Sequence, residues 1–166
     1  MGEPMMVKAK VNGLALDVTS NSPVVILSPE DSEKVLPIWI GHFEAWAIAM
    51  ELSGVTSKRP MTHDLLRRVI EAVGNTVEKI EVTELKDQTF YATIHLRGNG
   101  TTFQIDARPS DSIALALKTK APIFVNEELF QDRKKGDETK DQYDPEALRE
   151  RLRNIKPEDF GHYSLG

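Results

Sequence analysis

Short apolar runs rich in β-branched residues open the chain and predict strands. These runs are 5–11, 14–18, 23–28 and 35–40. Turn-forming residues separate them, beginning with Asn12-Gly13. The pattern then changes at 42–54, which is apolar on nearly every side and ends at Gly54. This segment predicts a helix buried inside the domain, and we expect Trp39 and Trp46 in the core.

Residues 62–74 predict a second helix, with Thr62 as its N-cap and Gly74 closing it. Its apolar side consists of Leu65, Leu66, Val69, Ile70 and Val73. The second half of the chain repeats this order. It carries strands at 77–85, 89–96 and 102–107, an apolar helix at 108–120, an extended segment at 122–125 and a further helical segment from 126.

The two apolar helices match each other at an offset of 67 positions, which pairs Gly41 with Arg108 and Glu44 with Asp111. We interpret the chain as two copies of a β3α2 unit, which predicts an α+β domain over residues 5–130. Residues 131–166 are expected to form a charged linker and a short C-terminal helical tail with Asp144 as its N-cap. The tail has a single stripe of Leu148, Leu152 and Ile155, so it must pack on the domain or on another chain.

Asn99-Gly100 favours a two-residue type I′ turn and so predicts the register of one hairpin. Its apolar face pairs Leu96 with Phe103 and Ile94 with Ile105. Its polar face pairs His95 with Gln104, Thr93 with Asp106 and Tyr91 with Arg108. We therefore expect Asp106, His95 and Arg108 to share one polar surface.

Composition narrows the choice of function. The 166 residues include no cysteine, which excludes disulfides and cysteine nucleophiles, and no run reaches the length of a membrane span. The start of the chain lacks a signal-peptide core, so a soluble cytoplasmic protein is expected. The net charge of −5 argues against a general nucleic-acid binder, so any contact with nucleic acid must be local.

The acids Glu44, Asp64, Asp106 and Asp111 have two interpretations. Glu44 and Asp111 fall third in their helices, with Pro109 first in its helix, where a carboxylate meets free backbone N–H groups and the helix dipole. Alternatively, these acids and His63 converge at helix and strand ends and hold Mg²⁺ or Mn²⁺, with Glu44, Asp106 and Asp111 as ligands.

His63 and Asp64 also have an ordinary interpretation, as a solvated histidine and a partner of the helix dipole. A basic group flanks them, consisting of Lys58, Arg59, Arg67 and Arg68. Such a group is commonly a solvated face, yet here it is placed to guide a phosphodiester.

Several of these segments together resemble the bifunctional nuclease domain family. They are LPIWIG, RPMTHDLL, TFYATI, DARPSDSIALAL and APIFV, and the resemblance covers about residues 5–130 in order. Where family members usually read SDAIALA, this chain has Ser112. The resemblance implies two β3α2 repeats that form one barrel-like, largely antiparallel sheet with buried helices, and it implies a homodimer.

Two functions stay open at this point. The first is a nuclease that hydrolyses DNA or RNA, with catalytic roles for His63, Asp64, Asp106, Arg108 and Asp111 and with Arg59, Arg67 and Ser110 binding substrate. A metal-free variant would use His63 and Arg108 on RNA, whose 2′-hydroxyl supplies the nucleophile. The second is a non-enzymatic dimeric binding or regulatory module whose acids are helix caps.

Overall fold

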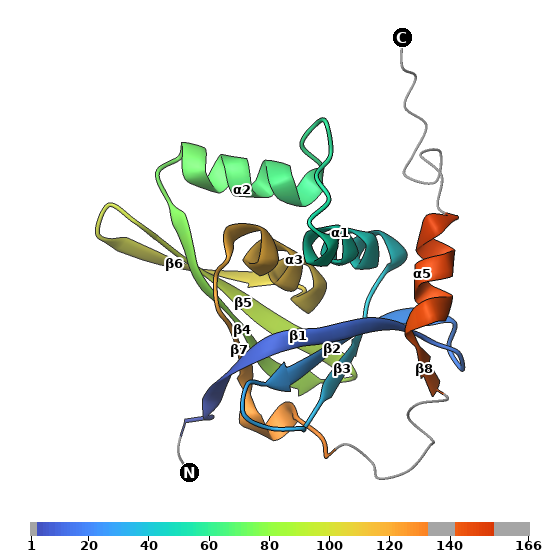
Figure 1. The fold of residues 1–166 in the computed structure, drawn as a ribbon. Helices are drawn as coiled ribbons and strands as arrows, with labels where there is room; N and C mark the ends of the chain where they lie inside the picture. The colour runs from blue at the N-terminus through green and yellow to red at the C-terminus, as the bar shows by residue number, and fades with distance from the viewer. Residues whose placement is uncertain (1–2, 133–141, 155–166) are drawn as a thin grey trace.

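The computed structural model describes residues 3–132 and 142–154. The chain forms three strands, two helices, three strands, one helix and a further strand, before a tail that adds a short strand and a helix (Figure 1). The first strands are β1 (Met6–Asp17), β2 (Ser22–Pro29) and β3 (Leu36–Trp39), and the next three are β4 (Thr76–Lys86), β5 (Thr89–Gly98) and β6 (Thr101–Ala107). The helices are α1 (His42–Ser53), α2 (Thr62–Ala72) and α3 (Pro109–Thr119).

One sheet runs through the whole domain in the order β3-β2-β1-β7-β4-β5-β6, with β8 (Tyr143–Asp144) beside β1. Strand β7 (Ile123–Asn126) joins the two halves, because it pairs antiparallel with β1 and parallel with β4. Every other pairing is antiparallel. The predicted α+β class with a largely antiparallel sheet is therefore confirmed.

The sheet is not closed within the described residues, so the predicted barrel-like form is not confirmed. The end strands β3 and β6 each pair with one neighbour there. The second half also ends differently from the first, because a three-residue 3₁₀ helix, η1 (Glu127–Leu129), follows β7 where a full helix was expected. The two-copy repeat stays a prediction.

Strand β1 corrects the sequence interpretation at Asn12-Gly13, which we expected to be a turn between two strands. The strand is continuous over twelve residues, and its register with β2 shifts between Val11 and Gly13. A β-bulge of this kind bends a strand without ending it. The bend lets the start of β1 pair with β7 while its end pairs with β8.

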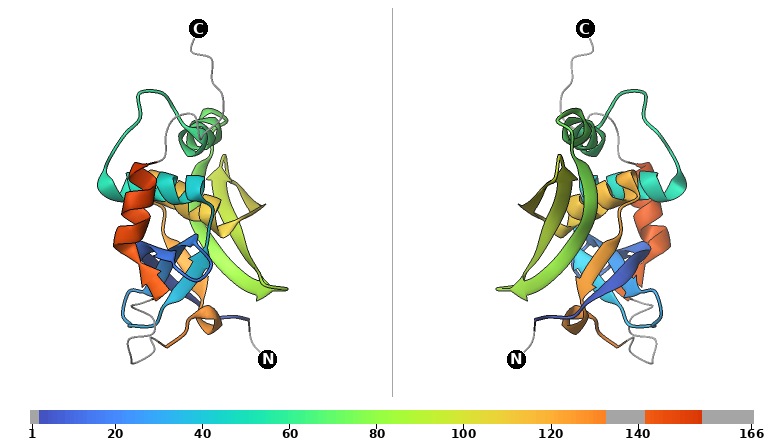
Figure 2. Two further views of the ribbon diagram at one scale, coloured as in Figure 1. Left: turned by 90° about the vertical axis from the view of Figure 1, so that its right-hand side faces the viewer. Right: turned by 90° about the vertical axis from the view of Figure 1, so that its left-hand side faces the viewer.

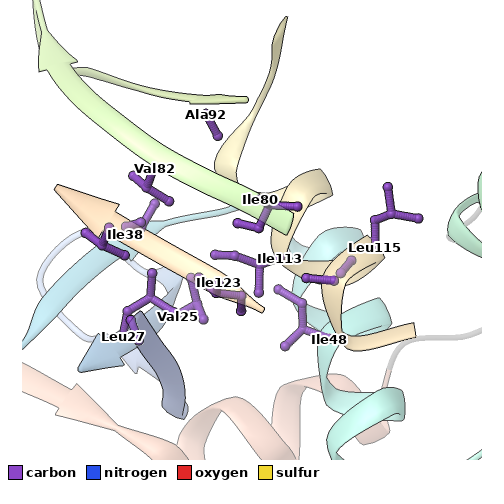
Figure 3. Packing of buried hydrophobic residues seen from close by; sticks show 14 of the residues in the cluster. Val25, Leu27, Ile38, Ile48, Ile80, Val82, Ala92, Ile113, Leu115 and Ile123 are labelled. Atoms are coloured by element: carbon purple, nitrogen blue, oxygen red, sulfur yellow. The ribbon is translucent and has the colours of Figure 1, made fainter. Parts of the chain in front are cut away.

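The core lies between the sheet and the helices, and Figure 2 shows the helices gathered on one side of the β4–β6 layer. Ile80 of β4 lies beside Ile113 of α3, with Ile48 of α1 close by, and Val82 belongs to the same cluster (Figure 3). Seven of the eleven residues of α3 are buried. In α1 only Ala45 and Ile48 are fully buried and most of the other residues are half-buried, so the prediction of a buried helix at 42–54 holds only in part.

The hairpin register is confirmed. Leu96 pairs with Phe103, Ile94 with Ile105, His95 with Gln104 and Thr93 with Asp106. Asn99 and Gly100 both have positive φ, at 53° and 75°, as a type I′ turn requires.

The tail packs on the domain over its described residues. Asp144 caps α5 (Pro145–Arg153) as predicted, because its Oδ1 accepts from the backbone N–H groups of Glu146 and Ala147 at 3.0 and 3.1 Å. Leu148 is buried, and Arg151 donates to the backbone oxygen of Asn21 at 3.0 Å. Ile155, the last residue of the predicted stripe, lies outside the described residues.

Both tryptophans lie closer to the surface than expected. Trp39 is 46% exposed, and its Nε1 donates to the buried Asp17 Oδ2 at 2.7 Å. Trp46 is half-buried. Among the described helices, none has the length and apolar character that a membrane crossing requires.

Candidate functional site

A cleft of about 450 Å³ lies where α1, α2 and α3 meet. Helix α1 lines it with Phe43, Ala47 and Met50, and α3 lines it with Asp111 and Lys118. The connection between α1 and α2 and the first turn of α2 form the remaining wall, which includes His63 and Asp64. Sites of this size, with converging polar groups, are typical of small-ligand and substrate binding.

A continuous network of polar and charged side chains runs along the cleft. His63 Nε2 lies 2.9 Å from Asp111 Oδ1, and Arg108 Nε donates to Asp111 Oδ2 at 2.9 Å. Arg108 Nη2 donates to Glu44 Oε1 at 2.8 Å. The N-terminal turns of all three helices are therefore joined through two carboxylates and one guanidinium.

Local sequence places these groups. Gly41 and Arg108 are the N-cap residues of α1 and α3, and Pro109 is the first residue of α3, as predicted. Glu44 and Asp111 consequently fall at the third position of their helices. The Glu44 carboxylate lies against the backbone at Gly41. A Cβ at position 41 would collide with Glu44 Oε2, so glycine lets the carboxylate take this position.

Ser112 occupies the position at which family members were expected to carry alanine, and its hydroxyl is fully buried. Its Oγ donates to the backbone oxygen of Arg108 at 3.0 Å. This bond back to the preceding turn satisfies the hydroxyl inside the helix, so the departure is accommodated without disturbing Asp111.

These contacts shift the pKa values of Asp111 and Arg108. The hydrogen bond from His63 lowers the pKa of the Asp111 carboxyl, burial acts in the opposite direction, and the bond from Arg108 adds to the lowering. The pKa of the Arg108 guanidinium is raised, chiefly by its hydrogen bond to Asp111. Asp111 therefore stays ionised at neutral pH and holds the histidine by charge as well as by geometry.

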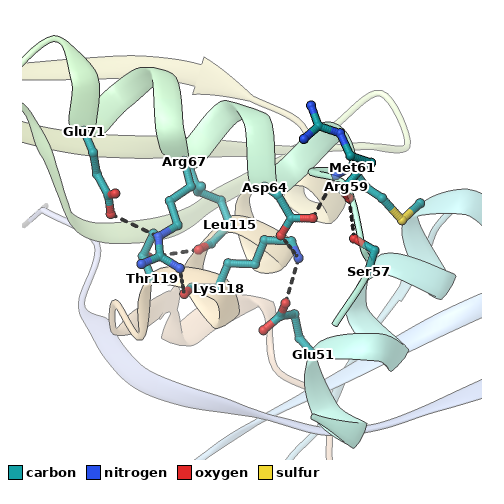
Figure 4. A network of polar contacts seen from close by, with 10 residues as sticks. All are labelled: Glu51, Ser57, Arg59, Met61, Asp64, Arg67, Glu71, Leu115, Lys118 and Thr119. Atoms are coloured by element: carbon teal, nitrogen blue, oxygen red, sulfur yellow. Dashed lines mark hydrogen bonds and ion pairs between the residues drawn. The ribbon is translucent and has the colours of Figure 1, made fainter. Parts of the chain in front are cut away.

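A second ionic group, drawn in Figure 4, lines the same cleft. Lys118 Nζ is 2.7 Å from both Glu51 Oε1 and Asp64 Oδ1, and the lysine side chain is only 9% exposed. Burial acts to lower the pKa of Lys118, but the two carboxylates outweigh it and the net pKa is raised. Burial likewise acts to raise the pKa of Asp64, and the hydrogen bonds from Lys118 and the Met61 N–H bring it below its usual value.

Sequence reasoning missed Glu51 and Lys118 as members of this site. The signal was present, because these two residues also stand 67 positions apart and carry opposite charges at matching positions of two apolar helices. A buried charge inside an apolar helix needs a partner. The same 67-residue offset that aligned Glu44 with Asp111 also aligns Glu51 with Lys118, so it could have predicted their ion pair.

Other predicted site residues lie elsewhere. Asp106 is exposed on β6, opposite Thr93, and is not among the residues lining the cleft. The register places His95 and Asp106 on one face of the β5–β6 pair as expected, but His95 contacts Glu81 of β4, and Arg108 contacts Asp111 and Glu44. Ser110 is buried in the first turn of α3 and does not line the cleft.

The basic group is divided in the same way. Arg67 lines the cleft but pairs with Glu71 at 3.0 Å, and Arg59 does not line it. Lys58 and Arg68 line the cleft, and within the described residues neither makes an ion pair. These two cations are therefore placed to attract an incoming anion.

The helix-cap interpretation holds for one acid. Asp64 Oδ2 accepts from the backbone N–H of Met61 at 2.9 Å, and Met61, rather than Thr62, is the N-cap of α2. Glu44 contacts Arg108 at the start of α3, and Asp111 contacts both Arg108, the N-cap of its own helix, and His63 of α2.

The side chains do not fit a divalent cation as they are arranged. Within residues 3–132 and 142–154, no three His, Cys, Asp or Glu side chains are grouped to hold a metal ion. Glu44, Asp64 and Asp111 each bind a cationic side chain already. The remaining predicted ligand, Asp106, does not line the cleft.

The fold and the cleft define a class of protein: an α+β domain in which three helices enclose one charged site. Comparison with known sequences identifies the class further, since the profile of the bifunctional nuclease domain matches residues 25–137. An uncharacterised protein of Mycobacterium tuberculosis is 36% identical over 166 residues, covering 93% of this chain and 98% of that protein. The chain belongs to the bifunctional nuclease domain family.

Several plant relatives are named bifunctional nucleases. Bifunctional nuclease 1 of Arabidopsis thaliana is 27% identical over 64% of this chain, and bifunctional nuclease 1 of Oryza sativa subsp. japonica is 25% identical over 68%. The chain spans about a third of the length of these plant proteins, 34% and 35% respectively.

Proposed function

We propose that this protein cleaves phosphodiester bonds of nucleic acid in the cleft between α1, α2 and α3. The observation that carries the proposal is the chain from His63 through Asp111 to Arg108, which joins a proton-transfer group to a phosphate-binding group. The family and the names of the plant relatives support the substrate class.

His63 is the proposed acid–base group. With Nε2–H donated to Asp111, Nδ1 carries the lone pair and takes the proton from the attacking O–H group, which is the 2′-hydroxyl of RNA or, on DNA, a water molecule. The new P–O bond forms as the bond to the leaving oxygen breaks, and solvent returns a proton to that oxygen. Asp111 orients the ring and stabilises the imidazolium that forms, as an acid does beside a catalytic histidine elsewhere.

Arg108 is the proposed group for the developing charge on the phosphate. Its side chain is 66% exposed and uses Nε and Nη2 on the two acids, which leaves its other N–H groups for a phosphate oxygen. Lys58 and Arg68 add positive charge to the same cleft. No step runs through a metal ion, because the side chains present do not fit one, and hydrolysis is expected to persist in EDTA.

Hydrolysis of labelled single-stranded RNA and DNA tests this proposal. His63→Ala and Asp111→Asn should each lower the rate by about a hundredfold or more, as expected when an acid–base group or its orienting partner is lost. Asp87→Asn, a change in the exposed turn between β4 and β5, should retain the full rate and controls for contaminating nucleases. Equal rates in all three variants would reject the site.

Asp106→Asn separates the structural interpretation from the sequence interpretation. The sequence predicts a large loss of activity, because it counts Asp106 among the catalytic and metal-binding acids. The structure predicts the wild-type rate, because Asp106 does not line the cleft. A hundredfold loss in this variant, with its melting temperature unchanged, would restore Asp106 to the site.

A non-enzymatic dimeric binding module is the second candidate, and one observation favours it. Helix α2 and its C-cap Val73 expose four apolar side chains, Leu65, Leu66, Val69 and Val73. An apolar surface of this kind is typical of a contact with another chain. We therefore also propose the homodimer that the family resemblance implies, which is compatible with either function.

A further inference from the structure

The cleft has an apolar half that the proton-transfer chain does not use. Phe43, Ala47 and Met50 follow helical spacing along α1, so they share the face that lines the cleft. Val55 and Met61, from the connection to α2, line the cleft too. Phe43 is 50% exposed there. An exposed aromatic ring inside a concave site is a surface that a ligand is suited to cover.

The charges beside this apolar wall limit the chemical class of ligand that the cleft can bind. Phe43 precedes Glu44, which binds Arg108, and Lys58 and Arg68 line the same cleft. A matching ligand therefore combines a flat apolar part with an anionic part. An apolar peptide side chain would fill the wall but would offer no anion to these cations. A nucleotide has both parts, and 450 Å³ lies within the usual range for a small-molecule site.

We propose that the apolar half of the cleft binds one unpaired nucleobase, which stacks on Phe43 while its phosphate lies towards Arg108. This inference rests on the proposed function, because it names the part of a nucleic-acid substrate that enters beside the reacting group. A base inside a duplex is paired and stacked, so it cannot reach the ring without leaving the helix. The substrate is therefore single-stranded at the site of cleavage.

Binding, measured apart from cleavage, tests the subsite. Three labelled probes are compared: an oligodeoxythymidylate, the same strand with its central nucleotides replaced by abasic sites, and a duplex of equal length. Binding of each is measured by fluorescence anisotropy at one salt concentration. The intact strand should bind about tenfold or more tightly than the abasic strand, because base–aromatic stacking supplies a factor of this order. The duplex should bind no better than the abasic strand.

Variants of the full chain assign the effect to Phe43. Phe43→Ala should remove most of the difference between the intact and abasic strands, about tenfold, and leave abasic binding unchanged. Phe43→Trp should keep the difference, because indole also stacks. Phe103→Ala is the matched control, since Phe103 is similarly exposed, at 44%, but lies on β6 away from the lining of the cleft.

The outcomes separate this inference from the proposed function. Base-dependent binding without hydrolysis supports the subsite and rejects the nuclease. Hydrolysis with equal affinity for the intact and abasic strands supports the nuclease and overturns the subsite. Three results with the variants would also overturn the subsite. Phe43→Ala could lose the same affinity for the intact and the abasic strand, or Phe103→Ala could lose as much affinity as Phe43→Ala. A lower mass of Phe43→Ala in light scattering would show that the ring lies in a protein interface.

Discussion

Helices α2 and α3 both carry site residues in their first turns, but they are attached to the domain in different ways. Helix α3 buries seven of its eleven residues between the sheet and the other helices. Helix α2 buries only His63 and Ile70. Its first turn is attached mainly through polar contacts to α3: His63 to Asp111 and Asp64 to Lys118.

The difference shows how this site is built. The carboxylate that orients the histidine stands on a helix fixed by the core, so its position follows from close packing. The histidine itself stands on a helix that contributes only Ile70 to the hydrophobic core and is otherwise held largely by polar contacts to α3. A change in the core of α3 should therefore disturb the whole fold, whereas a change in those contacts should loosen α2 selectively.

The largest expected effect is on the α3 side. Ile113→Ala should lower the free energy of unfolding by about 3 kcal/mol, because Ile113 is fully buried and its loss leaves a cavity among Ile48, Ile80 and Leu115. Urea unfolding followed by circular dichroism measures the change. A loss below about 1 kcal/mol would mean that α3 is less tightly packed than its burial indicates.

A smaller effect is expected where α2 is tied to α3. Lys118→Met should cost about 2 kcal/mol, because it leaves the Asp64 and Glu51 carboxylates facing each other without their shared cation. Both carboxylates are about a quarter to a third exposed, which moderates the cost.

The location of that loss distinguishes α2 from the rest of the domain. Amide hydrogen exchange should accelerate in α2 of Lys118→Met more than in β4 or β5. Lys86→Met, at the exposed end of β4, is the control and should leave exchange unchanged. Uniform acceleration over the whole chain would show that the lysine supports global stability and does not hold α2 selectively.

The sequence predicted local structure in this protein better than it predicted burial. The hairpin register followed from Asn99-Gly100, and the start of α3 followed from Arg108-Pro109. Turn and cap chemistry is local, so it can be read from neighbouring residues. The apolar side of α2 did not reveal its surroundings, because amphipathic spacing shows which residues share a face but not what covers that face.

The site was predicted in part for the same reason. His63, Asp64, Glu44 and Asp111 were identified from their positions in first turns and Arg108 from the polar face of the hairpin, and the structure brings all five to one cleft. Asp106 was added because the hairpin register placed it beside the expected polar surface. Whether α3 turns Arg108 towards Asp106 or towards Glu44 depends on how the helix crosses α1, which no strand register determines.

The pH dependence of stability should distinguish the Asp111 contact from surface charge. The folded-state pKa of Asp111 lies below its ordinary value of 3.8, so its contribution to stability is present above that value and is lost as pH falls through the folded pKa. Wild-type stability should therefore decline below about pH 4. Asp111→Asn should start less stable at pH 7 and decline less steeply, whereas Asp87→Asn should follow the wild type. If the stability of Asp111→Asn and of the wild type fell equally steeply with decreasing pH, the Asp111 contact would not be the cause of the decline.

The smallest effect on the folded monomer is expected at the exposed face of α2. Val69 is 51% exposed, so Val69→Ser removes little buried apolar area and should change the free energy of unfolding by less than about 0.5 kcal/mol, apart from a small difference in helix propensity. The same change has a second readout. If two copies pair through Leu65, Val69 and Val73, the mass from light scattering at micromolar concentration should fall from twice 18.6 kDa towards 18.6 kDa in the variant, and its melting temperature should lose its dependence on concentration. A wild-type mass near 18.6 kDa would reject the homodimer. A dimer that persists in Val69→Ser and in Val69→Asp would place the interface elsewhere and would leave the apolar face of α2 without an assigned role.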